Sequence, residues 1–120
     1  MDGKDSLTQT MEIVDAFTSQ RDWDQFHTVK NLISSISIEA AELSETVQWS
    51  NPSKEQVLAD SKLVEAMSHE LADVMVYCLR LCSVLNQDPI QIMHEKIKLN
   101  ADKYPIEKVK GSSKKYSDYD

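Results

Sequence analysis

Apolar residues recur every three or four positions along most of the chain, and this spacing predicts four main helices. Three of them are expected over about residues 6–20, 27–49 and 61–85, and the fourth begins at Pro89 and ends near residue 104. The third helix carries the longest apolar stripe, which consists of Leu63, Val64, Met67, Leu71, Val74, Cys78, Leu81 and Leu85. Because helices bury their apolar faces against one another, the pattern favours an all-α, four-helix bundle.

Polar and proline-containing segments separate these helices. Residues 21–26 form the expected connector, residues 50–53 break the chain, and residues 54–60 form either a short helix or a loop. Asp88 is expected to cap the fourth helix, because a proline follows it at the first helical position. The polar residues 107–120 form either a disordered tail or a flap that orders over a ligand.

The length and composition indicate one domain. A chain of 120 residues can bury one core but not two, and only two Gly and three Pro disfavour a turn-rich sheet. We therefore expect an all-α domain over residues 1–106 and a polar tail over residues 107–120. Ile38, Val76 and Val84 lie off the main apolar stripes, so these helices are expected to be buried on more than one side. This arrangement favours a homodimer or a homotetramer.

The charge and the cysteines restrict partners and location. A formal net charge of −7 makes nucleic acid and anionic membranes poor candidate partners, whereas a small anionic substrate fits if metal ions mask the acidic residues. The N-terminal segment has no apolar signal region, and no apolar run approaches the ~20 residues that a membrane span needs. Cys78 and Cys82 suit two reduced core thiols better than a disulfide. A cytoplasmic location is therefore expected.

Two acidic pairs are the main candidate for chemistry. Glu39 and Glu42 lie three positions apart on the second predicted helix, and Glu70 and Asp73 have the same spacing on the third. Residues three apart share a helix face, so two antiparallel helices would bring the four carboxylates together. Like charges this close need protons or a cation, and an all-oxygen ligand set favours Mg²⁺, with Mn²⁺ as the second candidate.

Three other interpretations compete with a magnesium site. The first is that the four acids are solvated surface residues. A Lys or Arg four positions after each acid would indicate such surface pairing, but those positions hold Leu43, Thr46, Val74 and Tyr77. A di-iron bundle needs Glu-x-x-His on two helices, and the second pair ends in an aspartate instead. A zinc-protease motif requires a second histidine four positions after His69, where the chain again has that aspartate.

The acidic pattern resembles a known enzyme family. Glu39-Ala-Ala-Glu42, a spacer and Glu70-Leu-Ala-Asp73 look like the ExxE…ExxD signature of the all-α nucleoside triphosphate pyrophosphohydrolases, the MazG-like and dimeric dUTPase-like superfamily. The flanking segments resemble its dCTP pyrophosphatase branch; they are residues 21–32, 48–49, 77, 96–105 and 112–116. The resemblance covers about residues 10–116.

The resemblance implies an activity and a metal site. Members of this superfamily cleave a nucleoside triphosphate between the α- and β-phosphates and release the monophosphate and pyrophosphate. Carried over to this chain, Glu39, Glu42, Glu70 and Asp73 would be the catalytic residues and the Mg²⁺ ligands. The general base would be Glu42 or Glu39.

The resemblance also implies residues that contact the nucleotide. The phosphate contacts would come from Lys96, Asn100, Lys103 and Tyr104. Candidates for contacting the base or the sugar are Trp23, Phe26, His27, Asn31, Trp49 and Tyr77. Additional positive charge near the phosphates could come from Lys30, Lys114 and Lys115.

The sequence therefore predicts Mg²⁺-dependent hydrolysis of dCTP, or of a base-modified dCTP, in nucleotide-pool sanitation. One alternative keeps the reaction and changes the substrate to dUTP or to other non-cognate nucleoside triphosphates. Another is a non-catalytic helical binding module that has kept the scaffold, against which the four intact acids argue.

Overall fold

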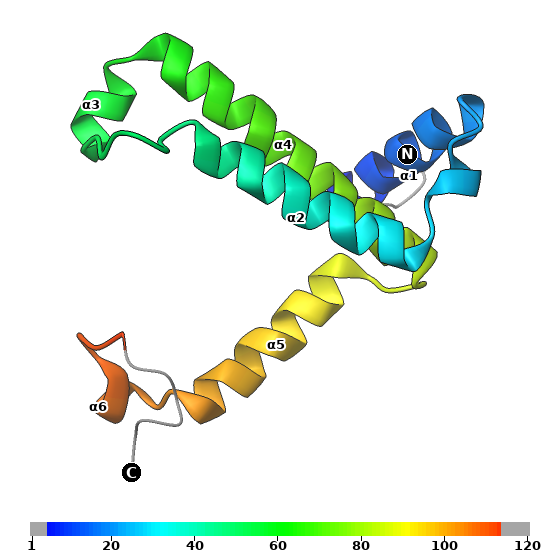
Figure 1. Ribbon diagram of the computed structural model, residues 1–120. Helices are drawn as coiled ribbons and strands as arrows, with labels where there is room; N and C mark the ends of the chain where they lie inside the picture. Colours follow the sequence, from blue (N-terminus) through cyan, green and yellow to red (C-terminus); the bar gives the residue numbers. More distant parts are fainter. Residues whose placement is uncertain (1–4, 114–120) are drawn as a thin grey trace. The chain divides into compact units, whose positions relative to one another are not determined.

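The computed structural model describes residues 5–113, and within this range the chain forms helices and no strand (Figure 1). The elements in order are α1 (Ser6–Gln20), the 3₁₀ turn η1 (Asp24–Phe26), α2 (Val29–Glu45), α3 (Lys54–Leu58), α4 (Ser61–Val84), α5 (Pro89–Lys103) and α6 (Ile106–Val109). Two compact units are present, one ending at Asn86 and one beginning at Gln87. The predicted all-α fold is confirmed.

Polar caps fix where the long helices of the first unit begin. Asp5, Thr28 and Asp60 precede α1, α2 and α4, and each side chain accepts a hydrogen bond from the backbone N–H three residues on, at 2.7, 3.1 and 3.1 Å. These bonds satisfy N–H groups that a helix leaves unpaired in its first turn. The predicted starts of the first and third long helices are therefore correct.

Helix α2 is shorter than the predicted range of residues 27–49. It begins at Val29 because Thr28 is its cap, and it ends at Glu45. Beyond this point the hydroxyl of Thr46 donates to the backbone oxygen of Leu43 at 2.8 Å, and residues 46–49 continue as turns. A threonine that bonds to the local backbone offers an alternative to the helical ladder, which the apolar spacing alone does not reveal.

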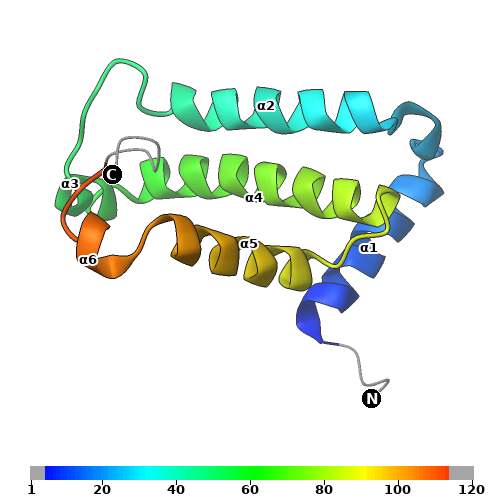
Figure 2. The same cartoon turned by 90° about the horizontal axis from the view of Figure 1, so that it is seen from below.

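Helices α2 and α4 form the centre of the first unit. They run antiparallel and side by side, as both ribbon views show (Figures 1 and 2). Helix α1 packs against α4 near its C-terminal end, and the short α3 contacts α4 as well. The most buried side chains are Leu32 of α2, which is 1% exposed, and Val14 and Thr18 of α1. This packing sets the acidic pairs of α2 and α4 on neighbouring helices.

The second unit contains α5 and α6. Asp88 caps α5, since its carboxylate accepts hydrogen bonds from the backbone N–H groups of Ile90 and Gln91 at 2.9 and 3.1 Å. Pro89 stands at the first helical position, as predicted. Residues 107–109, which the sequence assigned to a polar tail, belong to α6. In residues 5–113, no helix combines the length and the apolar character that crossing a membrane requires.

Candidate metal centre and adjoining pocket

The antiparallel packing of α2 and α4 brings three of the predicted acidic residues together. Glu39, Glu70 and Asp73 can each offer one carboxylate oxygen to a common point, and these oxygens lie within 4.8 Å of one another. Glu39 and Glu70 are half-buried, whereas Asp73 is exposed. One side of the cluster is therefore covered by the helices, and the other side is open to solvent.

Two oxygens of this cluster lack the partners that buried polar atoms normally have. Oε2 of Glu39 and Oε2 of Glu70 are inaccessible to solvent, and no group in the described structure forms a hydrogen bond with either atom. A buried polar atom without a partner is costly, and such atoms are rare in folded proteins. A cation between the two helices would satisfy both oxygens at once.

The surroundings of these carboxyls disfavour their charged forms. Burial raises the pKa of Glu39, and the adjacent Glu42 carboxyl and the charges of Asp73 and Glu70 raise it further. Burial also raises the pKa of Glu70, followed by Glu42, Asp73 and Glu45. Glu42 thus lies beside the three-residue cluster and acts on both of its glutamates.

The donor set fits a hard divalent cation. It consists of carboxylate oxygens alone, the ligands that Mg²⁺ and Mn²⁺ prefer, and it contains none of the histidines that zinc and di-iron sites use. His69, which precedes Glu70, is not part of the cluster. The orphaned oxygens of Glu39 and Glu70 and the raised pKa values supply the physical reason for a cation here.

The raised pKa of Glu39 predicts a pH-dependent stability of the metal-free protein. A carboxyl whose pKa is higher in the folded than in the unfolded chain does not change the free energy of unfolding at a pH below its ordinary pKa. As pH rises above that value and through the raised pKa, the carboxyl lowers the free energy of unfolding. In EDTA, Glu39→Gln should therefore melt at a higher temperature than the wild type at pH 8 and close to it at pH 5. Differential scanning fluorimetry measures this, with Glu65→Gln, an exposed acid on α4, as control. A wild-type protein as stable as Glu39→Gln at pH 8 would contradict the electrostatic interpretation.

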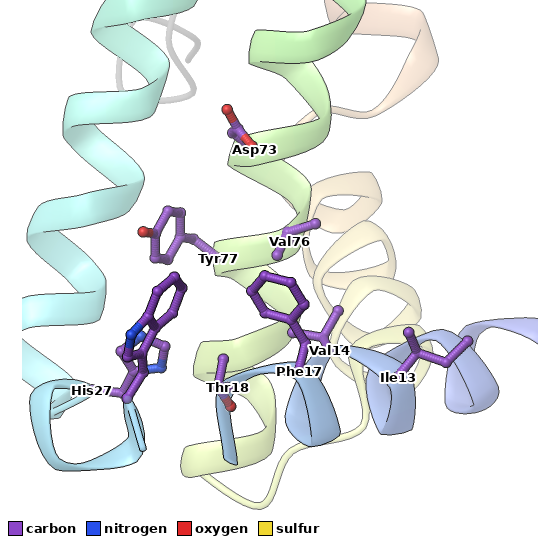
Figure 3. A pocket seen from close by; sticks show the side chains of 9 residues that line it. Ile13, Val14, Phe17, Thr18, His27, Asp73, Val76 and Tyr77 are labelled. Atoms are coloured by element: carbon purple, nitrogen blue, oxygen red, sulfur yellow. The ribbon is translucent and has the colours of Figure 1, made fainter. Parts of the chain in front are cut away.

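A cavity of about 380 Å³ adjoins the acidic cluster (Figure 3). It lies within the first unit, between α1, α4 and the segment that precedes α2. Its lining is mainly apolar and aromatic, and consists of Ile13, Val14, Phe17, Thr18, Trp23, His27, Asp73, Val76 and Tyr77. Figure 3 shows Asp73 and Tyr77 on neighbouring turns of α4, with Phe17 of α1 reaching toward Val76. Asp73 belongs to both the cavity and the acidic cluster.

Aromatic rings form two sides of this cavity. Phe17 and Trp23 meet edge to face with ring centroids 5.6 Å apart, and the guanidinium carbon of Arg21 lies 3.7 Å from the centroid of Phe17. His27 and Tyr77 are also edge to face, at 6.4 Å. Such pairs hold the rings in fixed orientations.

The structure brings only part of the predicted base and sugar contacts to the cavity. Trp23, His27 and Tyr77 line it. Asn31 does not, because its side-chain amide donates to the backbone oxygen of Phe26 at 3.0 Å and closes the turn before α2. Trp49 follows α2 beyond the cavity and is 91% exposed in the single chain. Asn31 and Trp49 therefore do not line this cavity, and a base- or sugar-binding role for them stays a prediction from the resemblance.

Sequence reasoning missed several residues of this region. Val14 and Phe17 belong to the helical repeat of apolar residues in the first helix, and in the structure both also line the cavity. Thr18 carried no signal of its own. Arg80 was also missed: its side chain is only 12% exposed and it binds Asp15, Asp24 and His27. Its position on the most apolar helix was the signal, because an arginine that is mostly buried must have partners.

The predicted phosphate contacts lie in the second unit. Lys96, Asn100 and Lys103 are on α5, and Tyr104 is the residue that ends this helix. Lys30 lies on α2, while Lys114 and Lys115 fall outside the described residues. A phosphate-binding role for these residues stays a prediction from the resemblance.

Comparisons with known proteins agree with the family resemblance. The model of the MazG-like family matches residues 34–119. The chain is 34% identical over 103 residues to dCTP pyrophosphatase 1 of Mus musculus and 32% identical over 104 residues to dCTP pyrophosphatase 1 of Homo sapiens. Each alignment covers 85% of this chain and 61% of the relative, so the chain spans about three fifths of the length of these curated relatives.

A solved structure is similar over nearly its whole length. The crystal structure of a pyrophosphatase from Archaeoglobus fulgidus superposes with a TM-score of 0.78 and 36% sequence identity. The match covers 88% of this chain and 97% of the archaeal one.

Proposed function

Because this chain belongs to the MazG-like family, we propose that it is a nucleoside triphosphate pyrophosphohydrolase that converts dCTP, or a base-modified dCTP, to the monophosphate and pyrophosphate. The names of its relatives in mouse and human support the substrate, and the archaeal structure supports the type of reaction. Removal of unwanted deoxynucleotides from the nucleotide pool is the role that fits this reaction.

The single observation that carries this proposal is the position of Asp73. This residue lies in the acidic cluster and also lines the aromatic cavity. A cation held by the cluster would therefore lie next to the space that can receive a planar base. A nucleotide needs both features within its own length, an acidic metal site for the phosphates and an apolar slot for the base.

The acidic residues would hold Mg²⁺, with Mn²⁺ as the second candidate. When bound, such an ion would mask the triphosphate charge and lower the pKa of a water molecule. Glu39, Glu70 and Asp73 supply the ligand oxygens. Glu42 lies beside the cluster and outside that ligand set, so it is the carboxylate we assign to accept the proton of the attacking water.

Assembly into a dimer or tetramer belongs to the same proposal. Large apolar side chains on α2 and α4 are about half exposed, namely Ile33 (52%), Ile38 (57%), Leu71 (47%) and Met75 (53%). Large apolar side chains left half exposed on packed helices are typical of a surface that another subunit covers. Light scattering should give at least twice the 13.7 kDa mass of one chain, and a monomer would contradict this assembly.

The test is hydrolysis of a nucleotide panel. Purified protein with Mg²⁺ should turn over dCTP faster than dUTP, dTTP, dATP and ATP, with chromatography of the products as the measurement. Preference for dUTP or a damaged nucleotide would keep the reaction and replace the substrate. Equal rates with dCTP and ATP would contradict a pyrimidine-selective pocket, and no hydrolysis of any nucleotide would favour the non-catalytic binding module.

A further inference from the structure

The side chain of Arg80 forms hydrogen bonds with residues of α1, of η1 and of the turn that precedes α2, all around the cavity. From α4, its Nη1 donates to Asp15 of α1 at 2.9 Å, and its Nη2 donates to Asp24 of η1 at 2.7 Å. Its third nitrogen, Nε, donates to Nδ1 of His27 at 3.0 Å. With both ends of the guanidinium held by carboxylates, the plane of the group and the direction of the Nε–H bond are fixed.

This geometry determines the protonation state of the His27 ring. The guanidinium has only donors, so the nitrogen that it contacts must present a lone pair. Nδ1 of His27 therefore carries no proton, and the neutral ring carries its proton on Nε2. A doubly protonated ring would place an N–H group against the N–H group of Arg80.

The charges around His27 agree with a neutral ring. Burial lowers the pKa of His27, the positive charge of Arg80 lowers it further, and Asp24 opposes both. Asp15 faces the same guanidinium from α1, and the Tyr77 ring of α4 lies 6.4 Å from the imidazole, centroid to centroid. Arg80 forms ion pairs with both carboxylates, Asp15 and Asp24.

The free ring nitrogen matters because His27 lines the cavity. Since Nδ1 is engaged by Arg80, Nε2 is the ring nitrogen left for a ligand. We propose that Arg80 is a positioning residue, which holds His27 as the Nε2–H tautomer so that the cavity offers a hydrogen-bond donor to the nucleobase. The inference rests on the proposed function, because it identifies which base edge the same site accepts.

A fixed donor selects bases by the atom that they place against it. A carbonyl oxygen or an unprotonated ring nitrogen, both of which cytosine has on its pairing edge, accepts the bond from Nε2. An amino group in the same place would put two donors against each other, and neither would have an acceptor. Burying such unsatisfied donors costs more free energy than a single hydrogen bond contributes. If the tautomer could change, Nε2 would become an acceptor and this selection would be lost.

Nuclear magnetic resonance of the imidazole nitrogens tests the tautomer directly, without turnover. In the wild-type protein at pH 8, Nδ1 of His27 should resonate as a lone-pair nitrogen and Nε2 as an N–H nitrogen, with His27→Gln providing the assignment. In Arg80→Met the ring should become a mixture of tautomers, and its pKa should rise. Arg80→Lys, which keeps the charge but not the planar fork, should retain the low pKa and lose the fixed tautomer. A proton on Nδ1 in the wild type, or an unchanged tautomer in Arg80→Met, would overturn the proposal.

A matched pair of variants tests the effect on the base. In His27→Asn the side-chain oxygen can still accept from Arg80, but the donor toward the cavity is lost; in His27→Gln the amide N–H can take the place of Nε2. KM for dCTP should rise roughly three- to tenfold in His27→Asn, as loss of one hydrogen bond predicts, and less in His27→Gln. The value of kcat should change little in either. Equal KM values in wild type and His27→Asn would overturn the proposal.

Different results would contradict the proposed function and the positioning role of Arg80. If the wild type hydrolyses no nucleotide but His27 is the fixed Nε2–H tautomer, the proposed function is wrong and the Arg80 contact stands as local structure without a substrate role. If dCTP is hydrolysed and the tautomer is not fixed, the proposed function stands and the positioning role of Arg80 is wrong.

Discussion

Replacing Glu70 by glutamine should reduce kcat/KM for dCTP by roughly 100- to 10,000-fold, the loss expected when several kcal/mol of metal-dependent stabilisation disappear. Glu70 has a carboxylate oxygen without a partner and lies within 4.8 Å of the Glu39 and Asp73 oxygens. Glutamine keeps the shape of the side chain and removes its charge. Steady-state release of pyrophosphate at saturating Mg²⁺ measures the effect.

The same variant separates loss of metal from loss of fold. Because burial and neighbouring acids raise the pKa of Glu70, glutamine should stabilise the metal-free protein at pH 8, where the wild-type carboxyl is forced to ionise. Added Mg²⁺ should raise the melting temperature of the wild type and have a much smaller effect on Glu70→Gln. An active Glu70→Gln that Mg²⁺ still stabilises would show that the acidic cluster is not the metal site.

Replacing Trp23 by alanine should raise KM for dCTP by roughly five- to 150-fold, since stacking on an aromatic side chain contributes ~1–3 kcal/mol per base. The indole lines the cavity and is held edge to face by Phe17, so it is already oriented before a ligand arrives. Activation by Mg²⁺ should be unchanged, because Trp23 is not part of the acidic cluster. Initial rates over a range of dCTP and Mg²⁺ concentrations measure both quantities.

Phe26→Ala is the matched comparison for Trp23→Ala. Phe26 is an aromatic residue of the same segment, is 60% exposed and does not line the cavity. Its loss should raise KM much less than the loss of Trp23. Equal effects would mean that the cavity is not where the base binds.

The acidic cluster could be predicted from the sequence because its geometry is local. Two residues three positions apart face the same way on any helix, so the only further requirement was that α2 and α4 lie side by side. Their apolar stripes supplied that requirement. The sequence did not reveal that Glu42 lies beside the oxygens of Glu39, Glu70 and Asp73 rather than among them. This distinction depends on side-chain directions at the helix contact.

The cavity could be predicted only in part because apolar spacing does not tell a core face from a pocket wall. Phe17 belongs to a regular helical stripe, yet its side chain is 45% exposed and faces an open space. Trp49, which the resemblance places among the base or sugar contacts, does not line this cavity, and α2 ends four residues before it. The local hydrogen bond of Thr46 carries the chain into turns there.

The Arg80 contacts could not be predicted from local sequence. Its partners Asp15, Asp24 and His27 are 65, 56 and 53 residues away, so no helical period or short motif connects them. They come together because α1 packs on α4 and because Asp24 of η1 bonds to Arg80. The cavity therefore depends on tertiary structure to a greater degree than the acidic cluster does.

We propose that the acidic cluster and the aromatic cavity together cleave a nucleoside triphosphate between its α- and β-phosphates. ³¹P nuclear magnetic resonance of the products formed from dCTP and Mg²⁺ tests this proposal. We expect the signals of dCMP and pyrophosphate in equal amounts. Formation of dCDP and orthophosphate would contradict it, because the attacked phosphorus would then be the γ-phosphate.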